Sequence, residues 1–332
     1  MPLTGIAAAH EVNNRYAEPT YHTQTRGSKQ MSIALNLFFA LLFGSLFFSG
    51  HEKLVELLML NAMLQLCLFL IVACIPFLKT KRVSYVDIAW PFGVALIGVQ
   101  ILLMGETDFI RQLLVGGIYL LIGLRMGIGA LVMAKKTGVI FKTEFPRYQY
   151  RRMILENSGS KHVNGHLLAE IMAQGLANMT VLALPGFLIA MNGNDAISTL
   201  EIIGIGVWVA AYFVESTADG QKLLFISKNK SGVCNIGLWK YSRHPNYFAE
   251  WLVWTGLVVA AIPSWLHIES AENGFIWICL GVGMISASVM MYITLVHLTG
   301  ATPAEYYSVR KRKEYRAYQE KTNMFFPWFP KS

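Results

Sequence analysis

Apolar residues in this chain gather in long runs that short polar segments separate. About 20 mostly apolar residues are enough for a helix to cross the hydrocarbon core of a membrane. The runs predict eight spans, of which the sixth is short. The predicted spans are 32–49, 54–78, 83–104, 110–134, 167–191, 199–215, 247–263 and 274–297. The pattern therefore predicts an all-α fold, a polytopic membrane helix bundle of seven to eight transmembrane helices.

The composition agrees with this pattern. The chain is 54% hydrophobic and 14% charged, with a mean hydropathy of +0.44, which is typical of a polytopic membrane protein and not of a soluble domain. Residues 1–30 are polar and lack the apolar core of a signal peptide, so we expect a flexible cytoplasmic tail. The four cysteines have no metal-ligand spacing, and we expect no structural disulfide and no metal site.

The basic residues are distributed unevenly along the chain. Of the 28 Lys and Arg, 22 lie in the segments 79–82, 135–166, 216–246 and 298–332, whereas the intervening loops are neutral or acidic. The positive-inside rule explains this alternation for eight spans with both termini in the cytoplasm. Because of this distribution, we attribute the net charge of +8 to a membrane orientation and not to a nucleic acid partner. The membrane would be a bacterial inner membrane or an endoplasmic reticulum-type membrane.

Asp87 is an ionisable residue inside a predicted span, in the stretch "VSYVDIAWPFG". The ring of Pro91 removes the helical hydrogen bond to the carbonyl of residue 87, so a carboxyl group and a freed carbonyl meet at membrane depth. One interpretation is a structural pair between Asp87 and a cation such as Arg125. The other is a group that polarises or protonates a lipid substrate. The sequence favours neither.

A pair of carboxylates follows the sixth predicted span. Glu215 and Asp219 are four residues apart and share a face if this segment is helical, where like charges destabilise the helix unless a cation or a ligand offsets them. Lys222, one turn further, is the obvious local partner. A solvated helix end with a salt bridge explains the pattern as well as a ligand site does.

The stretch "GLWKYSRHPNYFAEW" combines a helix start with several polar groups. Pro245 suits the first position of a helix, and the N-terminus of that helix attracts anions. Arg243 and His244 add donors for a phosphate at this point. Asn246 and Glu250 lie one turn deeper, where they can bind an amide or a ribose. A positive-inside anchor explains the cations but not these two residues.

The C-terminal segment interleaves aromatic and basic residues, including Tyr307, Arg310 and Tyr318. Its position after the last span favours a nucleotide cofactor or a lipid headgroup over a nucleic acid. The chain has no GxGxxG unit and no P-loop, so a dinucleotide site here would not be a Rossmann site.

Three stretches carry a family resemblance: "ESTADGQKLLF", "GLWKYSRHPNYFAEWLVWTG" and "AEYYSVRKRKEYRAYQEKTNMFFPWFP". With them, the chain resembles the steroid 5α-reductase superfamily, and within it an uncharacterised bacterial and organellar branch of the 3-oxo-5α-steroid 4-dehydrogenase C-terminal family. The resemblance is strong over residues 200–332 and looser over 83–152. It implies a single membrane domain over 31–332, with a substrate side at 31–166 and a cofactor side at 167–332.

The resemblance implies NADPH as cofactor, bound by residues of the second half. The residues that match the family's cofactor motif, or lie beside it, are Asp219, Lys222, Tyr241, Arg243, His244, Asn246, Glu250 and Arg310. In the first half the steroid enzymes polarise a ketone with a Glu and a Tyr. Asp87 stands in for the Glu by position, whereas the Tyr is missing near Ile122, so that Tyr85 or Tyr119 would have to replace it.

We therefore expect an NADPH-dependent oxidoreductase of lipid metabolism that reduces the C=C bond of a lipophilic enone, such as a sterol or a polyprenyl lipid. Burial would favour a protonated Asp87 that can donate a hydrogen bond to the substrate carbonyl. One alternative is an S-adenosylmethionine-dependent methyltransferase of the isoprenylcysteine carboxyl methyltransferase type, which shares the "RHP" turn. The other is a non-catalytic lipid-binding membrane protein that kept the fold.

Overall fold

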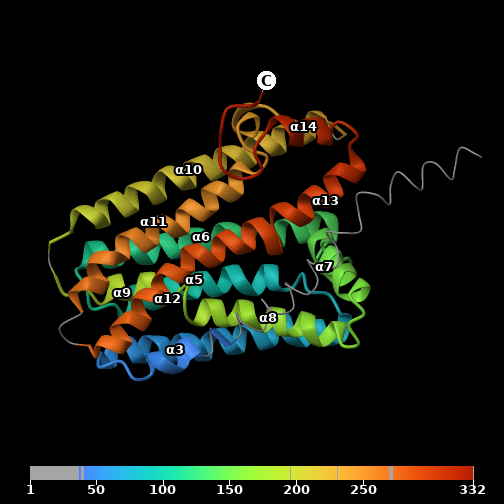
Figure 1. Cartoon of the computed structure of the whole chain (residues 1–332). Coiled ribbons are helices and arrows are strands. Elements are labelled where there is room, and N and C mark those ends of the chain that lie inside the picture. The colour runs from blue at the N-terminus through green and yellow to red at the C-terminus, as the bar shows by residue number, and fades with distance from the viewer. Residues whose placement is uncertain (1–36, 39–40, 195, 230, 269–271, 332) are drawn as a thin grey trace, which may run out of the picture.

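The computed structural model describes residues 37–38, 41–194, 196–229, 231–268 and 272–331 (Figure 1). Long helices lie side by side in this part of the chain, and no strand occurs in it. The helical elements are α3 (Glu52–Phe69), η1 (Leu70–Cys74), α4 (Ile75–Thr80), α5 (Val86–Met104), α6 (Phe109–Thr137), α7 (Pro146–Asn157), α8 (Val163–Met179), α9 (Leu184–Ala190), α10 (Thr199–Lys228), η2 (Gly237–Lys240), α11 (Pro245–His267), α12 (Gly274–Ile293), η4 (Thr294–Leu298), α13 (Ala301–Lys311) and α14 (Tyr315–Lys321). The all-α prediction is confirmed.

Seven helical segments of the described residues are long and apolar enough to cross a membrane, so the chain is a multi-pass membrane protein. They are Glu52–Thr80, Val86–Met104, Phe109–Thr137, Val163–Ala190, Thr199–Lys228, Pro245–His267 and Gly274–Lys311. These segments correspond to the second to eighth predicted spans. The first predicted span, 32–49, lies partly outside the described residues, although residues 41–46 are helical. The predicted tail, 1–30, lies wholly outside them.

The sixth predicted span is longer than its apolar run suggested. A capping box between Ser198 and Glu201 starts α10, and the helix continues for 30 residues to Lys228. Glu215 and Asp219 therefore lie inside the helix and not after it. The hydropathy falls at these carboxylates, and the helix continues because a cation from another helix contacts both of them, as described below.

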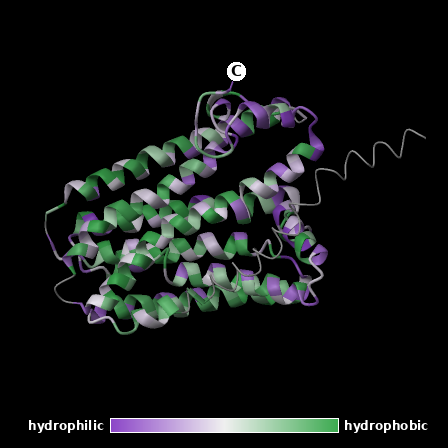
Figure 2. Cartoon of the chain, viewed as in Figure 1, coloured by the Kyte–Doolittle hydropathy of each residue, from purple (hydrophilic) through white to green (hydrophobic). Residues whose placement is uncertain are grey.

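The basic segments gather at one end of the bundle. Successive long helices cross the bundle in opposite directions, so the connections that follow α4, α6 and α10 all lie at the same end as α7, α13 and α14 (Figure 1). Hydrophilic residues concentrate at this end, whereas the long helices are mostly hydrophobic (Figure 2). This arrangement agrees with the alternation of basic and neutral segments along the sequence.

Glycines bring two pairs of helices into close contact. A side chain at Gly204 of α10 would lie 2.4 Å from the backbone nitrogen of Ala260 in α11, and one at Gly256 would lie 2.7 Å from the backbone oxygen of Gly204. Small residues allow such approach, and van der Waals packing then stabilises helices in lipid. A side chain at Gly123 of α6 would likewise lie 2.4 Å from the backbone of Ala95 in α5. These contacts fix the helices whose residues form the site.

Candidate functional site

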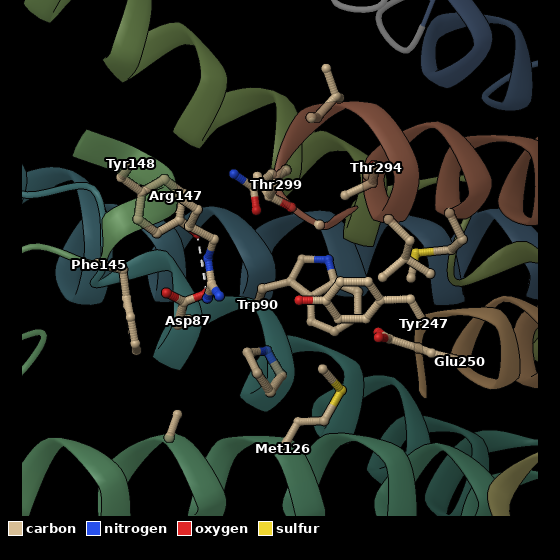
Figure 3. Close-up of a pocket in the computed structure, with 18 of the residues that line it drawn as sticks. Asp87, Trp90, Met126, Phe145, Arg147, Tyr148, Tyr247, Glu250, Thr294 and Thr299 are labelled. Atoms are coloured by element: carbon tan, nitrogen blue, oxygen red, sulfur yellow. Dashed lines mark hydrogen bonds and ion pairs between the residues drawn. The ribbon is translucent and has the colours of Figure 1, made fainter. Parts of the chain in front are cut away.

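A cavity of about 500 Å³ lies within the bundle, near the end where the basic segments gather. Residues from α5, α6, α7, α8, α10, α11 and the segment from α12 to residue 300 form its wall. Methionines such as Met126 and Met290 supply apolar surface beside a set of charged side chains. Figure 3 shows Asp87 and Glu250 on opposite sides of this space, with Trp90 and Tyr247 between them.

Two residues of α7 hold Asp87, which lies in the first turn of α5. Arg147 donates from Nη2 to Oδ1 of Asp87 at 2.6 Å, and the hydroxyl of Tyr148 donates to the same oxygen at 3.1 Å. The second oxygen, Oδ2, is buried and has no hydrogen-bond partner among the described residues. Asp87 therefore does pair with a cation, but the cation is Arg147 and not Arg125, because α7 folds over the start of α5 and Arg125 contacts α10 instead.

Glu144 explains why α7 reaches Asp87. Its carboxylate accepts from the backbone nitrogens of Val83 at 2.6 Å and Ser84 at 3.0 Å, which precede α5. Pro146 then occupies the first turn of α7, where its missing N–H has no cost. The loop is thus tied to the start of α5, and the next residue, Arg147, lies against Asp87.

Arg125 of α6 bridges the two carboxylates of α10. It donates from Nη1 to Glu215 and from Nη2 to Oδ2 of Asp219, the latter at 2.8 Å. The prediction that the carboxylates share one helical face is confirmed. Lys222 is not their partner, because its ammonium group lies over the ring of Trp239, 4.2 Å from the ring centroid. The neutralising cation comes from a distant part of the sequence.

Asn246 and Glu250 present acceptor groups to the cavity from the first two turns of α11. The side-chain nitrogen of Asn246 donates to Oδ1 of Asp219 at 3.1 Å, which fixes the orientation of the amide. Its oxygen is buried and has no hydrogen-bond partner among the described residues. A ligand with N–H or O–H donors would satisfy this oxygen, since buried polar groups are normally hydrogen-bonded.

Glu250 is the unpaired acid of the cavity. Of the five carboxylates that line it, four contact an arginine, whereas no described cation contacts the fifth, which is Glu250. The carboxylates are Asp87, Glu170, Glu215, Asp219 and Glu250, and the arginines are Arg125, Arg147 and Arg151. Glu250 is half-buried, and a charge shielded from water without a partner is costly. The site therefore favours a ligand that donates hydrogen bonds or carries positive charge at Glu250.

Tyr247 lines the cavity between the two sides, and sequence reasoning did not select it. Its ring stacks on that of His244, with centroids 5.2 Å apart and an interplanar angle of 4°. It lies one turn from Glu250 on the same helix, so the spacing within "HPNYFAE" was a usable signal. Arg147 and Tyr148 were also missed, although both lie in the basic segment 135–166.

The structure places Arg243 and His244 away from the cavity wall. Both are buried and contact Glu305 of α13: Arg243 donates from Nε at 2.6 Å, and Nε2 of His244 lies 3.1 Å from the same oxygen. Arg243 also donates to the backbone oxygens of Gln319, at 3.0 Å, and Thr322. Their expected role at a phosphate does not match this geometry, because the donors are used to anchor the C-terminal segment.

Four other candidates also lie outside the cavity wall. The hydroxyl of Tyr85 accepts from Nη2 of Arg82 at 2.9 Å, and that of Tyr119 donates to the backbone oxygen of Leu182 at 2.7 Å. The ring of Tyr241 packs edge-on against Phe329, 5.9 Å between centroids. Arg310 is exposed and lies over the ring of Tyr306. None of the four lines the described cavity.

The electrostatic surroundings change the ionisation of three groups outside the spans. Burial disfavours the charge of Arg147, but the carboxylate of Asp87 together with Tyr148 and Tyr247 outweighs this effect, so that the pKa of Arg147 is raised. Burial, together with the same carboxylate, raises the pKa of Tyr148. Burial lowers the pKa of His244, although its hydrogen bond with Glu305 acts in the opposite direction. Arg147 is thus a fixed cation and Tyr148 a fixed hydrogen-bond donor.

One known protein is similar to part of this chain. An uncharacterised protein of Schizosaccharomyces pombe, C594.04c, is 27% identical over 173 residues, which cover 45% of this chain and 46% of that protein. The chain thus matches about half the length of this relative. No solved structure matches the chain significantly.

A family model described as "Protein of unknown function (DUF1295)" matches residues 68–322. This range includes every residue that lines the cavity. The match extends over most of the chain, and the protein belongs to the DUF1295 family.

Proposed function

We propose that this protein is a membrane-embedded, NADPH-dependent reductase of the C=C bond of a lipophilic enone, such as a sterol-like or polyprenyl-like lipid. The observation that carries the proposal is the division of one cavity into two chemical sides. Acceptor groups of Asn246 and Glu250, in the first two turns of α11, lie on one side. The hydrogen-bond donors of Arg147 lie on the other, and the hydroxyl of Tyr247 lies between them. The resemblance to the steroid 5α-reductase superfamily supports the same reaction.

The acceptor side suits the nicotinamide end of the cofactor. A carboxamide or a ribose offers N–H and O–H donors, which the free oxygen of Asn246 and the carboxylate of Glu250 would accept. Asp219 holds Asn246 in the required orientation, and Arg125 holds Asp219. NADPH, when bound, supplies a hydride for the β-carbon of the enone. Lys222, Arg243 and His244 are engaged elsewhere, so they do not enter the proposed nicotinamide contacts.

The remaining wall suits a lipid. Apolar side chains from α6, α8 and η4 complete the cavity, including Met126, Ala177 and Leu295. Flexible methionines adapt to irregular apolar ligands. The substrate would reach the site from the membrane, and we expect no nucleic acid partner. The basic end of the bundle would face the cytoplasm, in a bacterial inner membrane or an endoplasmic reticulum-type membrane.

The unpaired Glu250 also gives a reason to retain the methyltransferase. A cationic sulfonium such as that of S-adenosylmethionine would offset this carboxylate. A methyltransferase of the isoprenylcysteine carboxyl methyltransferase type is therefore the second candidate function, and a non-catalytic lipid-binding protein is the third possibility to test.

Thermal unfolding of the purified protein with NADPH, NADP or S-adenosylmethionine separates these functions. A ligand at about a hundred times its dissociation constant adds about 2.7 kcal/mol to the free energy of unfolding. The proposal expects stabilisation by NADPH and NADP. Stabilisation by S-adenosylmethionine alone would favour the methyltransferase, and no stabilisation by any of the three would favour a non-catalytic protein.

A further inference from the structure

We infer that the hydroxyl of Tyr247, together with the guanidinium of Arg147, binds the carbonyl oxygen of the substrate, and that Tyr247 gives it a proton. The inference rests on the proposed reductase function and assigns the acid of that reaction. It moves this role from the start of α5, where Asp87 and Tyr85 were expected to act, to α11 and α7.

The hydroxyl of Tyr247 is free to act on a ligand. No hydrogen bond joins it to another residue that the structure describes, and the residue lines the cavity. Its ring is held in place by the stack on His244, which is itself held by Glu305 at 3.1 Å. In Figure 3 the hydroxyl extends from α11 into the space between Glu250 and Asp87. The group is therefore fixed in direction but without a partner.

The other candidate tyrosines are committed to protein contacts. The hydroxyl of Tyr148 donates a hydrogen bond to Asp87, and that of Tyr119 donates one to the backbone oxygen of Leu182. Tyr85 accepts from Arg82 and does not line the cavity. A tyrosine in the first half is thus unnecessary for the reaction, because α11 supplies one next to the acceptor pair.

Arg147 supplies a positive charge that can stabilise Tyr247 after it gives up its proton. It lines both the main cavity and a second cavity of about 240 Å³, and Tyr247 lines both as well. A guanidinium carries several N–H donors, and Nη2 is the nitrogen that contacts Asp87. Asp87 therefore acts as a positioning residue for Arg147, while the other donors of the guanidinium remain for a substrate oxygen.

NADPH, when bound, would supply the hydride for a C–H bond at the β-carbon and would be oxidised as the enone is reduced, while the C=C electrons shift towards the carbonyl. The carbonyl oxygen takes the hydroxyl proton of Tyr247, and Arg147 stabilises the resulting tyrosinate. The enol then returns to the ketone by taking a proton from water at the α-carbon and giving its O–H proton back to Tyr247. Preorganised donors of this kind stabilise charge that develops in a transition state.

The test uses 4-cholesten-3-one as the probe and the full-length protein with NADP, so that no reduction occurs. The infrared carbonyl stretch of the bound probe should lie at lower frequency than in detergent alone, because two donors contact the oxygen. Tyr247→Phe should return the stretch towards the detergent value. Tyr292→Phe is the matched control, since Tyr292 lies on α12 in an aromatic cluster outside the cavity.

Two further measurements complete the test. Tyr247→Phe should slow a single turnover with NADPH by about 10²–10⁴-fold while leaving stabilisation by NADPH unchanged. Arg147→Lys keeps the positive charge next to Asp87 but removes the guanidinium donors, so it should also raise the carbonyl frequency. This variant tests the proposed oxygen site if Tyr247→Phe does not fold. A lowered carbonyl stretch that neither variant changes would overturn the role of Tyr247 and leave the reductase intact. Failure of the wild type to bind enone and NADPH would overturn both.

Discussion

Arg243 and Glu305 form a buried ion pair that joins the start of α11 to α13. Nε of Arg243 lies 2.6 Å from Oε1 of Glu305, and Nη2 lies 3.1 Å from Oε2, so the contact is bidentate. The backbone nitrogen of Arg243 also donates to the backbone oxygen of Asn323 at 2.9 Å. The most basic-looking part of the cofactor motif is thus a structural anchor for the C-terminal segment.

Arg243→Met should therefore destabilise the fold more than it affects ligand binding. Removing one partner of a buried pair typically costs about 3–5 kcal/mol because the other charge stays buried. Unfolding in denaturing detergent measures this loss. Arg310→Met is the control, because Arg310 is exposed, and its effect should stay within about 0.5 kcal/mol. A stable Arg243→Met protein with weakened NADPH binding would instead identify Arg243 as a phosphate ligand.

Asp87 and Arg147 should show a favourable energetic coupling. Asp87→Asn leaves the guanidinium without its counter-ion, and Arg147→Met leaves the carboxylate without its cation. The double variant avoids both unpaired charges, so its loss of stability should be smaller than the sum of the two single losses by about 0.5–3 kcal/mol. Unfolding free energies of the four proteins measure the difference. Strictly additive losses would show that the two residues do not interact in the membrane.

Glu250→Gln should lose nucleotide binding without unfolding. The substitution keeps the size of the side chain but removes the acceptor charge, and a hydrogen bond to a charged group contributes about 1.5–3 kcal/mol. The dissociation constant for NADPH should then rise by about 10- to 100-fold. Thermal-shift titrations measure it, with Glu56→Gln as a control, since Glu56 lies on α3 and does not line the cavity. Unchanged affinity would remove Glu250 from the cofactor site.

His244 should make the folded protein less stable at mildly acidic pH. Burial lowers the pKa of His244 below its ordinary value of 6.5, so below that value the unfolded chain binds a proton that the folded protein resists. The contribution is absent above about pH 7.5, and stability falls as the pH drops below 6.5, by at most about 1.4 kcal/mol per unit.

His244→Asn, which keeps a donor near Glu305, isolates this effect. As the pH falls from about 7.5 to about 5.5, the unfolding free energy of the wild type should decrease more than that of the variant. A shift in favour of the wild type would mean that His244 is protonated in the fold, as a dominant pairing with Glu305 would require.

Much of the bundle was predictable because hydropathy alone locates spans. Two local features were also predictable because each depends only on neighbours in the sequence. They are Pro245 as the first helical residue and the shared helical face of Glu215 and Asp219. The end of α10 was not, because its continuation depends on Arg125, far away along the chain. Hydropathy reports local composition and carries no record of such partners.

The cavity itself needed the fold. Arg147 meets Asp87 because Glu144 ties the basic loop to the start of α5, a contact that no local pattern displays. The phosphate role of Arg243 followed from its position at a helix start, whereas Glu305, on a distant helix, decides its contacts. Whether the cavity binds NADPH and an enone remains a prediction from the chemistry of its wall.

The bridge that Arg125 makes to Glu215 and Asp219 has an evolutionary consequence. It joins α6, before residue 166, to α10, after it, and the cavity takes its wall from both parts. The two halves therefore cannot drift independently: loss of the arginine in one leaves two uncompensated acids in the other. Chimaeras that join 31–166 of one homologue to 167–332 of another should fold only when the residues at these three positions are compatible. The arginine and the two acids must therefore all be present or all be replaced.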